Sequence, residues 1–130
     1  MSTVRIPFEV TGWDPDPQTP AEHEAVRLGR VTLRKTFHGP LTGTSVVAMT
    51  SAAVGDAPAG YAAVELVTGT LEGRRGAFVL QHTGVVEAGT DPAGVVVPGT
   101  GTGELAGLTG TMTISHDDGA TTLVLDYQLP

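Results

Sequence analysis

The chain has 130 residues, no cysteine and a formal net charge of −7 at pH 7, with only 7 lysines and arginines. This length suits one domain, which we expect over residues 1–130. The lack of cysteine excludes disulfides and thiolate metal sites. The acidic net charge argues against a nucleic-acid partner. No apolar run approaches the roughly 18 residues of a membrane span, and the opening MSTVRIPFEV lacks the features of a signal peptide, so we expect a cytoplasmic protein with no membrane partner.

Segments typical of β-strands recur along the chain with short connections between them. Runs of valine, leucine, phenylalanine and threonine lead into turns rich in glycine and proline, as in an antiparallel sheet. We expect strands over residues 3–10, 22–37, 41–52, 61–71, 74–87, 95–97, 109–115 and 121–129.

The connections carry expectations of their own. The loop GWDPDPQTP at 12–20 contains three prolines, which cannot donate to a strand ladder, so no strand is expected there. Residues 103–108 suit a single helical turn, and HDDG at 116–119 suits a tight turn. The segment 20–30 leaves an alternative open, because its early acidic residues and late arginines also favour a helix of one or two turns.

This pattern of about eight antiparallel strands predicts an all-β fold. A closed barrel is the most economical arrangement, because closure removes exposed sheet edges, and a flattened sandwich is the alternative. The interior of such a barrel is either packed with side chains or holds one small ligand.

A two-residue turn at 72–73 would set the register of the central hairpin. Because side chains alternate along a strand, one face then carries the residues best suited to an interior. That face consists of Tyr61, Ala63, Glu65, Val67, Phe78, Leu80 and His82. Glu65 and His82 lie diagonally across the two strands, within reach of a hydrogen bond or one bridging water. A three-residue turn would shift the register and separate them.

Several segments resemble a known bacterial family: GRVTLRKTFHGPLTGTS, LVTGTLEGRRGAFVLQHTG, VVPGTGTGELAGLTGTM and the closing LDYQLP. With EVTGWD near the start, they look like the family called domain of unknown function 3224, over most of the chain from about Gly29 onward. That family resembles the allene-oxide-cyclase barrels, so the likeness implies a small closed antiparallel barrel, allene-oxide-cyclase-like or lipocalin-like. Related barrels include cyclases, dirigent-type proteins that steer a coupling, and proteins that only bind; the family itself has no settled activity.

Glu65 and His82 are the candidate catalytic residues. A carboxyl group on an apolar face has its pKa raised and an imidazole titrates near neutrality, so the two suit acid–base chemistry. The alternatives are a buried polar pair that only satisfies itself and a glutamate that points to solvent. Arg34 and Lys35 are adjacent on a strand, so one of them faces inward. An inward cation would pair with Glu65 or bind a substrate carboxylate, whereas a solvated charge is the ordinary outcome.

Five further side chains are candidates for contacting a ligand: Trp13, Met49, Phe78, Leu80 and Tyr127. Trp13 is expected to plug one end of the barrel, and stacking over a ligand is the alternative. A methionine in the middle of a strand is more often core filler than a ligand contact, so Met49 is the weaker candidate. Tyr127 would form a cavity wall and donate a hydrogen bond, although a structural tyrosine is the ordinary outcome.

The four histidines show no metal-ligand spacing, and the glycine-rich segments lack the residues of a phosphate loop, so we expect no metal and no cofactor. The sequence predicts a barrel that binds a mostly apolar small molecule, as a cofactor-free isomerase or cyclase. The alternatives are a non-catalytic binding or carrier protein and a structural oligomer with a filled interior. Only 16% of the residues are charged, which favours exposed apolar patches and leaves a homodimer open.

Overall fold

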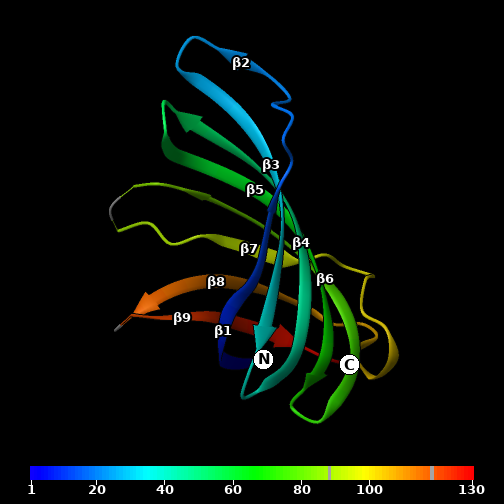
Figure 1. Cartoon of the computed structure of the whole chain (residues 1–130). Helices are drawn as coiled ribbons and strands as arrows, with labels where there is room; N and C mark the ends of the chain where they lie inside the picture. The colour runs from blue at the N-terminus through cyan, green and yellow to red at the C-terminus, as the bar shows by residue number, and fades with distance from the viewer. Residues whose placement is uncertain (88, 118) are drawn as a thin grey trace.

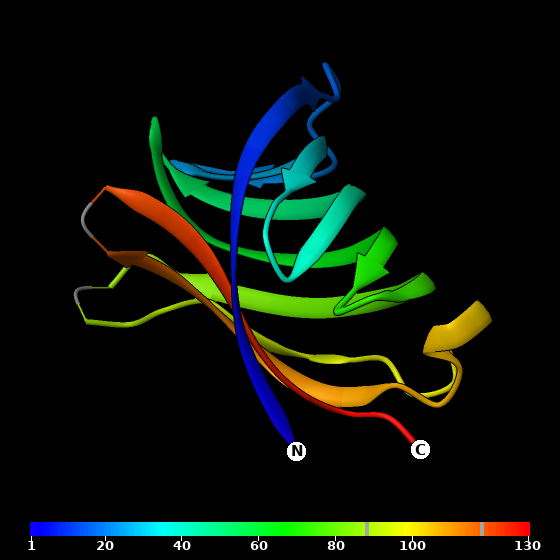
Figure 2. The same cartoon turned by 90° about the horizontal axis from the view of Figure 1, so that it is seen from below.

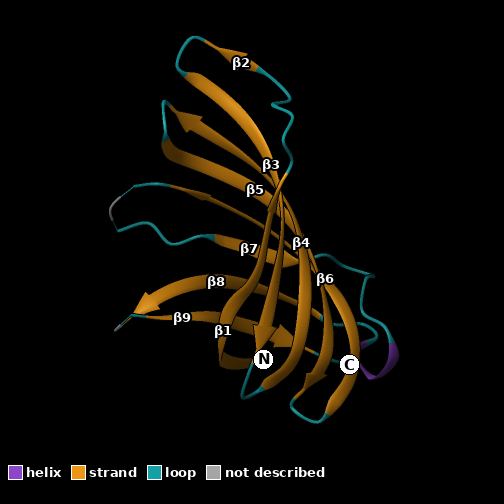
Figure 3. Cartoon of the chain, in the orientation of Figure 1, coloured by secondary structure: helices purple, strands orange, loops and turns teal. Residues whose placement is uncertain are grey.

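The computed structural model describes residues 1–87, 89–117 and 119–130. These residues form nine strands and one short 3-10 helix (Figures 1 and 3). In chain order they are β1 (Ser2–Pro15), β2 (Glu22–His23), β3 (Val26–Phe37), β4 (Leu41–Val54), β5 (Ala57–Leu71), β6 (Arg74–Val85), β7 (Ala93–Val96), η1 (Gly103–Leu105), β8 (Thr109–Asp117) and β9 (Ala120–Gln128). Within this part of the chain, no helix is long and apolar enough to cross a membrane.

The strands form one antiparallel sheet that closes on itself. Its order is β1-β9-β8-β7-β6-β5-β4-β3-β2, and β1 also pairs with β3. The first half of β1, residues 2–7, pairs with β9, and the second half, residues 8–15, pairs with β3. Figure 2 shows β1 crossing over the other strands to complete the ring. The predicted all-β antiparallel fold is therefore confirmed.

The prediction that no strand forms over residues 12–20 is wrong for its first part. Strand β1 runs on to Pro15, pairing Trp13 with Leu33 and Pro15 with Val31 after a register shift between Val10 and Gly12. Pro15 is the last residue of the strand, so its missing N–H interrupts no continuing ladder. The partner strand β3, distant in the sequence, supplies the pairing that local composition does not predict.

The helical alternative for residues 20–30 is also wrong. The segment forms the β2–β3 hairpin, which turns at Glu24 with φ = +55°. Strand β3 then pairs with β4 along its whole length, from Val26 opposite Val54 to Phe37 opposite Gly43. Pairing with a neighbouring strand overrides the weak helical charge pattern.

Two predicted turns lie where the sequence placed them. Glu72 and Gly73 form the two-residue turn, with φ of +46° and +83°, and the predicted register holds from Leu71 opposite Arg74 onward. The predicted helical turn at 103–108 contains η1. The predicted HDDG turn includes residue 118, which lies outside the described residues.

One end of the ring is filled; we call it the closed end. Both chain termini lie there (Figures 1 and 2). The segment 97–108 folds against β6, where the backbone N–H of Ala77 donates to Thr102 Oγ1 at 3.1 Å. Leu105 and Leu108 from this segment have no exposed surface and belong to the larger of two buried apolar clusters. The smaller cluster, built on Leu33, Val47 and Ala63 with Val31, Met49 and Tyr61 packed against it, lies farther along the interior.

Candidate functional site

In the part of the chain that the structure describes, four polar side chains are buried between the two apolar clusters. They are Lys35, Ser45, Glu65 and His82, one each from the neighbouring strands β3, β4, β5 and β6, and none is more than 6% exposed. Burial of polar groups costs free energy unless they are hydrogen-bonded. Among the described residues, no buried side-chain nitrogen or oxygen is without such a partner.

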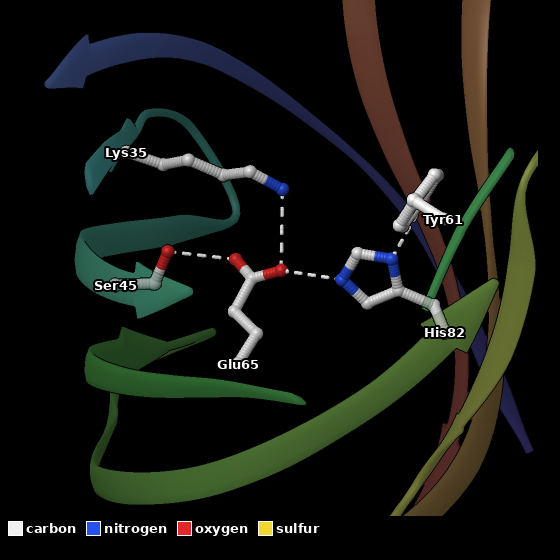
Figure 4. Close-up of polar contacts among 5 residues, drawn as sticks. All are labelled: Lys35, Ser45, Tyr61, Glu65 and His82. Carbon is white, nitrogen blue, oxygen red and sulfur yellow. Dashed lines mark hydrogen bonds and ion pairs between the residues drawn. The ribbon is translucent and has the colours of Figure 1, made fainter. Parts of the chain in front are cut away.

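Glu65 is at the centre of this cluster (Figure 4). Its Oε1 accepts hydrogen bonds from Lys35 Nζ at 3.1 Å and from His82 Nε2 at 2.8 Å, and its Oε2 accepts one from Ser45 Oγ at 2.7 Å. On the far side of the imidazole, the hydroxyl of Tyr61 lies 2.7 Å from His82 Nδ1. Tyr61, His82, Glu65 and Lys35 thus form one continuous chain of hydrogen bonds, which we call the relay.

The surroundings hold Glu65 in its charged form. Burial alone raises the pKa of this carboxyl group, but the hydrogen bond from His82, the charge of Lys35 and the hydrogen bond from Ser45 together outweigh burial and lower its pKa. The expected raised pKa of Glu65 is therefore wrong, because an apolar face alone does not reveal the inward cation. Burial, and secondarily the charge of Glu65, raise the pKa of Tyr61 to about 12, so its hydroxyl stays protonated.

Two glycines make room for the relay. Gly84 pairs with Tyr61 across β5 and β6, and a Cβ on Gly84 would lie 2.8 Å from Tyr61 Cε1. Gly94 pairs with His82 across β6 and β7, and a Cβ there would lie 1.9 Å from the backbone oxygen of Gln81. At both positions the backbone lies so close to a neighbouring strand or side chain that a residue with a side chain would fit only if that neighbour moved.

A pocket of about 330 Å³ lies beside Tyr61 at the end of the interior opposite the closed end; we call this the open end. The volume is at the lower limit of the range usual for small-molecule sites. Its lining is mostly apolar and includes Trp13, Val31, Met49, Ser51, Tyr61 and Val86. A larger hollow of about 830 Å³ is lined mainly by outward-facing residues such as Thr32, Ala48 and Gln81 on the outside of the ring. The apolar pocket is the better candidate, because Tyr61 connects it to the relay.

Comparison with known proteins identifies the family. The family model described as "Protein of unknown function (DUF3224)" matches residues 5–127. The chain belongs to this family. A solved structure of a DUF3224 protein of unknown function from Shewanella oneidensis MR-1 is 38% identical, with a TM-score of 0.88 over 100% of this chain and 98% of that one.

Other comparisons add no function to this DUF3224 chain. A pyocyanin demethylase structure is 11% identical, with a TM-score of 0.38 over 98% of this chain and 100% of that one. Likeness at this level carries no argument about fold or activity. No curated protein gives a significant match to the sequence.

In this DUF3224 chain, the structure brings together only some of the predicted site residues. Glu65 and His82 share a direct hydrogen bond, and Trp13 and Met49 line the pocket. Trp13 is 61% exposed, so it forms part of the pocket wall without plugging the end of the ring.

The other three predicted ligand-contacting residues lie elsewhere. Phe78 and Leu80 are at most 1% exposed, in the larger apolar cluster, and do not line the pocket. Tyr127 lies at the closed end, where its hydroxyl donates to Glu72. The three side chains thus contribute to packing and to the closed end.

The sequence pattern does not reveal the parts played by Tyr61 in the relay and by Ser45 in the buried cluster. It places Tyr61 on the interior face without a role, and it does not single out Ser45. Ser45 occupies an inward position of β4, between Gly43 and Val47, so strict alternation along that strand was the available signal. Of Arg34 and Lys35, the structure turns Lys35 inward to Glu65, which confirms one of the two outcomes that the sequence left open. In the described part of the chain, no group of three histidine or acidic residues could hold a metal ion.

Proposed function

We propose that this protein binds a small, mostly apolar organic molecule in the pocket at the open end. The observation that carries the proposal is the position of Tyr61, which lines an apolar pocket and whose hydroxyl joins a buried, charged relay. An apolar pocket with a few convergent polar groups is the usual form of a small-molecule site. The proposal requires no metal, cofactor, nucleic acid or membrane.

The proposed fold is one small closed barrel over residues 1–130, allene-oxide-cyclase-like or lipocalin-like. The double pairing of β1 supports it, because a sheet joined to itself along both edges of one strand encloses an interior. The asymmetry of that interior supports a cavity, since leucines fill the closed end and the pocket occupies the other.

In the catalytic version of this proposal, the protein is a cofactor-free isomerase or cyclase. Tyr61 would contact the substrate, and the pocket would hold a flexible molecule in a reactive shape. His82 and Glu65 would act through Tyr61, because their side chains are buried and Tyr61 lies between His82 and the pocket. Glu65 and His82 are then positioning and proton-relay residues.

The second candidate is a non-catalytic binding or carrier protein. The complete hydrogen bonding of the buried cluster favours it, because a satisfied polar network also serves to fix one packing arrangement. The two versions share the pocket and differ only in whether a bound molecule is converted.

The experiment that tests binding is a thermal-shift screen against small terpenoid and aromatic compounds. A ligand at a hundred times its Kd should stabilise the fold by about 2.7 kcal/mol. Ser51→Leu, which fills the pocket, should abolish the shift, while Thr44→Leu on the exposed face of the same strand should not. The proposal fails if no compound stabilises the protein or if Ser51→Leu binds as well as the parent. Product analysis of the compounds that bind separates an enzyme from a carrier.

A further inference from the structure

The hydrogen bonds of the relay have a fixed direction, which begins at Lys35. An ammonium group can only donate, so Glu65 Oε1, which lies 3.1 Å from Lys35 Nζ, acts as an acceptor there. The same oxygen lies 2.8 Å from His82 Nε2. A carboxylate can only accept, so His82 Nε2 carries a hydrogen and donates it to Glu65.

The direction continues through the imidazole to Tyr61. The titratable groups in contact with His82 are Glu65 and Tyr61, and Lys35 already pairs with Glu65. If the imidazole were protonated, the single carboxylate of Glu65 would have to balance two cations, Lys35 and His82. His82 is only 3% exposed, and burying an unbalanced charge is costly. The ring is therefore neutral with its hydrogen on Nε2, which leaves Nδ1 as an acceptor for the Tyr61 hydroxyl at 2.7 Å.

This direction determines what Tyr61 can offer a ligand. Its single hydroxyl hydrogen is used by His82, so the oxygen has only lone pairs left for the pocket. We propose that the pocket selects a ligand whose polar group at Tyr61 is a hydrogen-bond donor, namely an alcohol or a phenol, over the corresponding ketone or ether. The inference rests on the proposed function, since it names the class of molecule that the same pocket binds.

The other polar groups of the pocket do not make this selection. The Ser51 hydroxyl can donate or accept, so it tolerates either class of ligand, and the Trp13 indole N–H is a donor that would favour a carbonyl oxygen. A preference for an alcohol must therefore come from Tyr61.

The test compares menthol, menthone and menthyl methyl ether, which share one apolar skeleton. Trp13 is the single tryptophan of the chain and lines the pocket, so its fluorescence can report occupancy. Menthol should bind about tenfold more tightly than menthone or the ether, which is the ratio expected when one hydrogen bond is replaced by an unpaired acceptor. In Tyr61→Phe, all three should bind with Kd values within about twofold of one another, because the discriminating oxygen is gone. Thr83→Val, which removes an exposed hydroxyl from the outer face of β6, should leave the tenfold ratio unchanged.

A second variant tests the direction of the relay itself. His82→Leu removes the acceptor of the Tyr61 hydrogen, so the hydroxyl becomes free to donate and menthone should gain affinity relative to menthol. Equal or tighter binding of menthone by the parent protein would overturn the inference and leave the proposed function intact. If none of the three compounds gives saturable binding, the inference fails, and the proposed function is decided separately by the thermal-shift screen.

Discussion

Lys35 is the residue on which the charge balance of the buried cluster depends. It is 6% exposed, its Nζ pairs with Glu65, and it also lies 4.5 Å from the centre of the Phe8 ring. Lys35→Met should destabilise the fold by about 3–5 kcal/mol, because it leaves a buried carboxylate without its cation. Urea unfolding of this variant measures the loss. Arg34→Met is the matched control, because Arg34 is exposed on the same strand and should change stability by less than about 0.5 kcal/mol. Equal effects of the two substitutions would contradict the assigned role of Lys35.

The lowered pKa of Glu65 predicts a pH dependence of stability. Its folded-state pKa lies below the ordinary value of 4.5, so the unfolded chain binds more protons than the folded chain as the pH falls through this window. The stabilisation due to Glu65 is therefore present above about pH 4.5 and is lost as the pH falls through the lower, folded pKa. The free energy of unfolding, measured between about pH 6 and pH 3, should fall less steeply in Glu65→Gln than in the parent. The exposed carboxylate Glu87 offers the control, since Glu87→Gln should keep the parent's slope.

The sequence predicted part of this site at the level of single residues. The contact between Glu65 and His82 was predictable because a short turn and strict alternation fix where both side chains point. That Lys35 and not Arg34 faces inward was not predictable, because alternation requires one of two adjacent residues to face inward without determining which one. The link from Tyr61 to His82 depends on the path of a long side chain over Gly84, which no pattern in one strand contains.

At the scale of elements, the β5–β6 hairpin organises the site. Its turn residues Glu72 and Gly73 both have positive φ, as a two-residue hairpin turn requires. The hairpin register was predicted because the turn is local in sequence. The second half of β1 and the β2–β3 hairpin were mispredicted or left ambiguous, because their partners β3 and β4 come from outside the local segment. Local chemistry determined turns, whereas long-range pairing determined where the ring closes.

The turn itself can be tested by a single substitution. A Cβ on Gly73 would meet no atom within 4 Å, so Gly73→Ala is opposed only by its φ of +83°. The expected loss is about 1–2 kcal/mol of stability, the cost of a left-handed conformation for a residue with a side chain. Gly29→Ala is the matched control: its φ is not in the left-handed region and the nearest atom to its Cβ is Ser51 Oγ at 3.3 Å. Thermal unfolding should therefore show a smaller loss, or a gain, for Gly29→Ala. A result in the reverse order would mean that the turn conformation does not limit stability.

At the scale of the whole molecule, the two ends of the ring have different compositions. Leu105 and Leu108 complete the larger apolar cluster at the closed end, so that end contributes most of the buried apolar surface. The open end holds fewer buried residues and a pocket whose wall includes the exposed Trp13. The relay lies between them, where the packed cluster surrounds it on one side and the pocket begins on the other. Stability and ligand binding should therefore be separable by substitutions at opposite ends.

Leu108→Ala and Ser51→Leu test this separation together. Leu108 is fully buried at the closed end, so Leu108→Ala should cost about 2–5 kcal/mol of stability through lost apolar contacts and a cavity. Its Kd for the best ligand of the screen should stay within about twofold of the parent's at a temperature where the variant is folded, because sites at opposite ends of the ring act independently. Ser51→Leu should have the opposite profile: it abolishes binding, and its stability stays within about 1 kcal/mol of the parent's, since the added side chain enters space that is already empty. Chemical denaturation and calorimetric titration of both variants give the four values needed. If Leu108→Ala weakens binding as much as Ser51→Leu does, the interior responds as one unit, and the division into a packed end and a binding end is wrong.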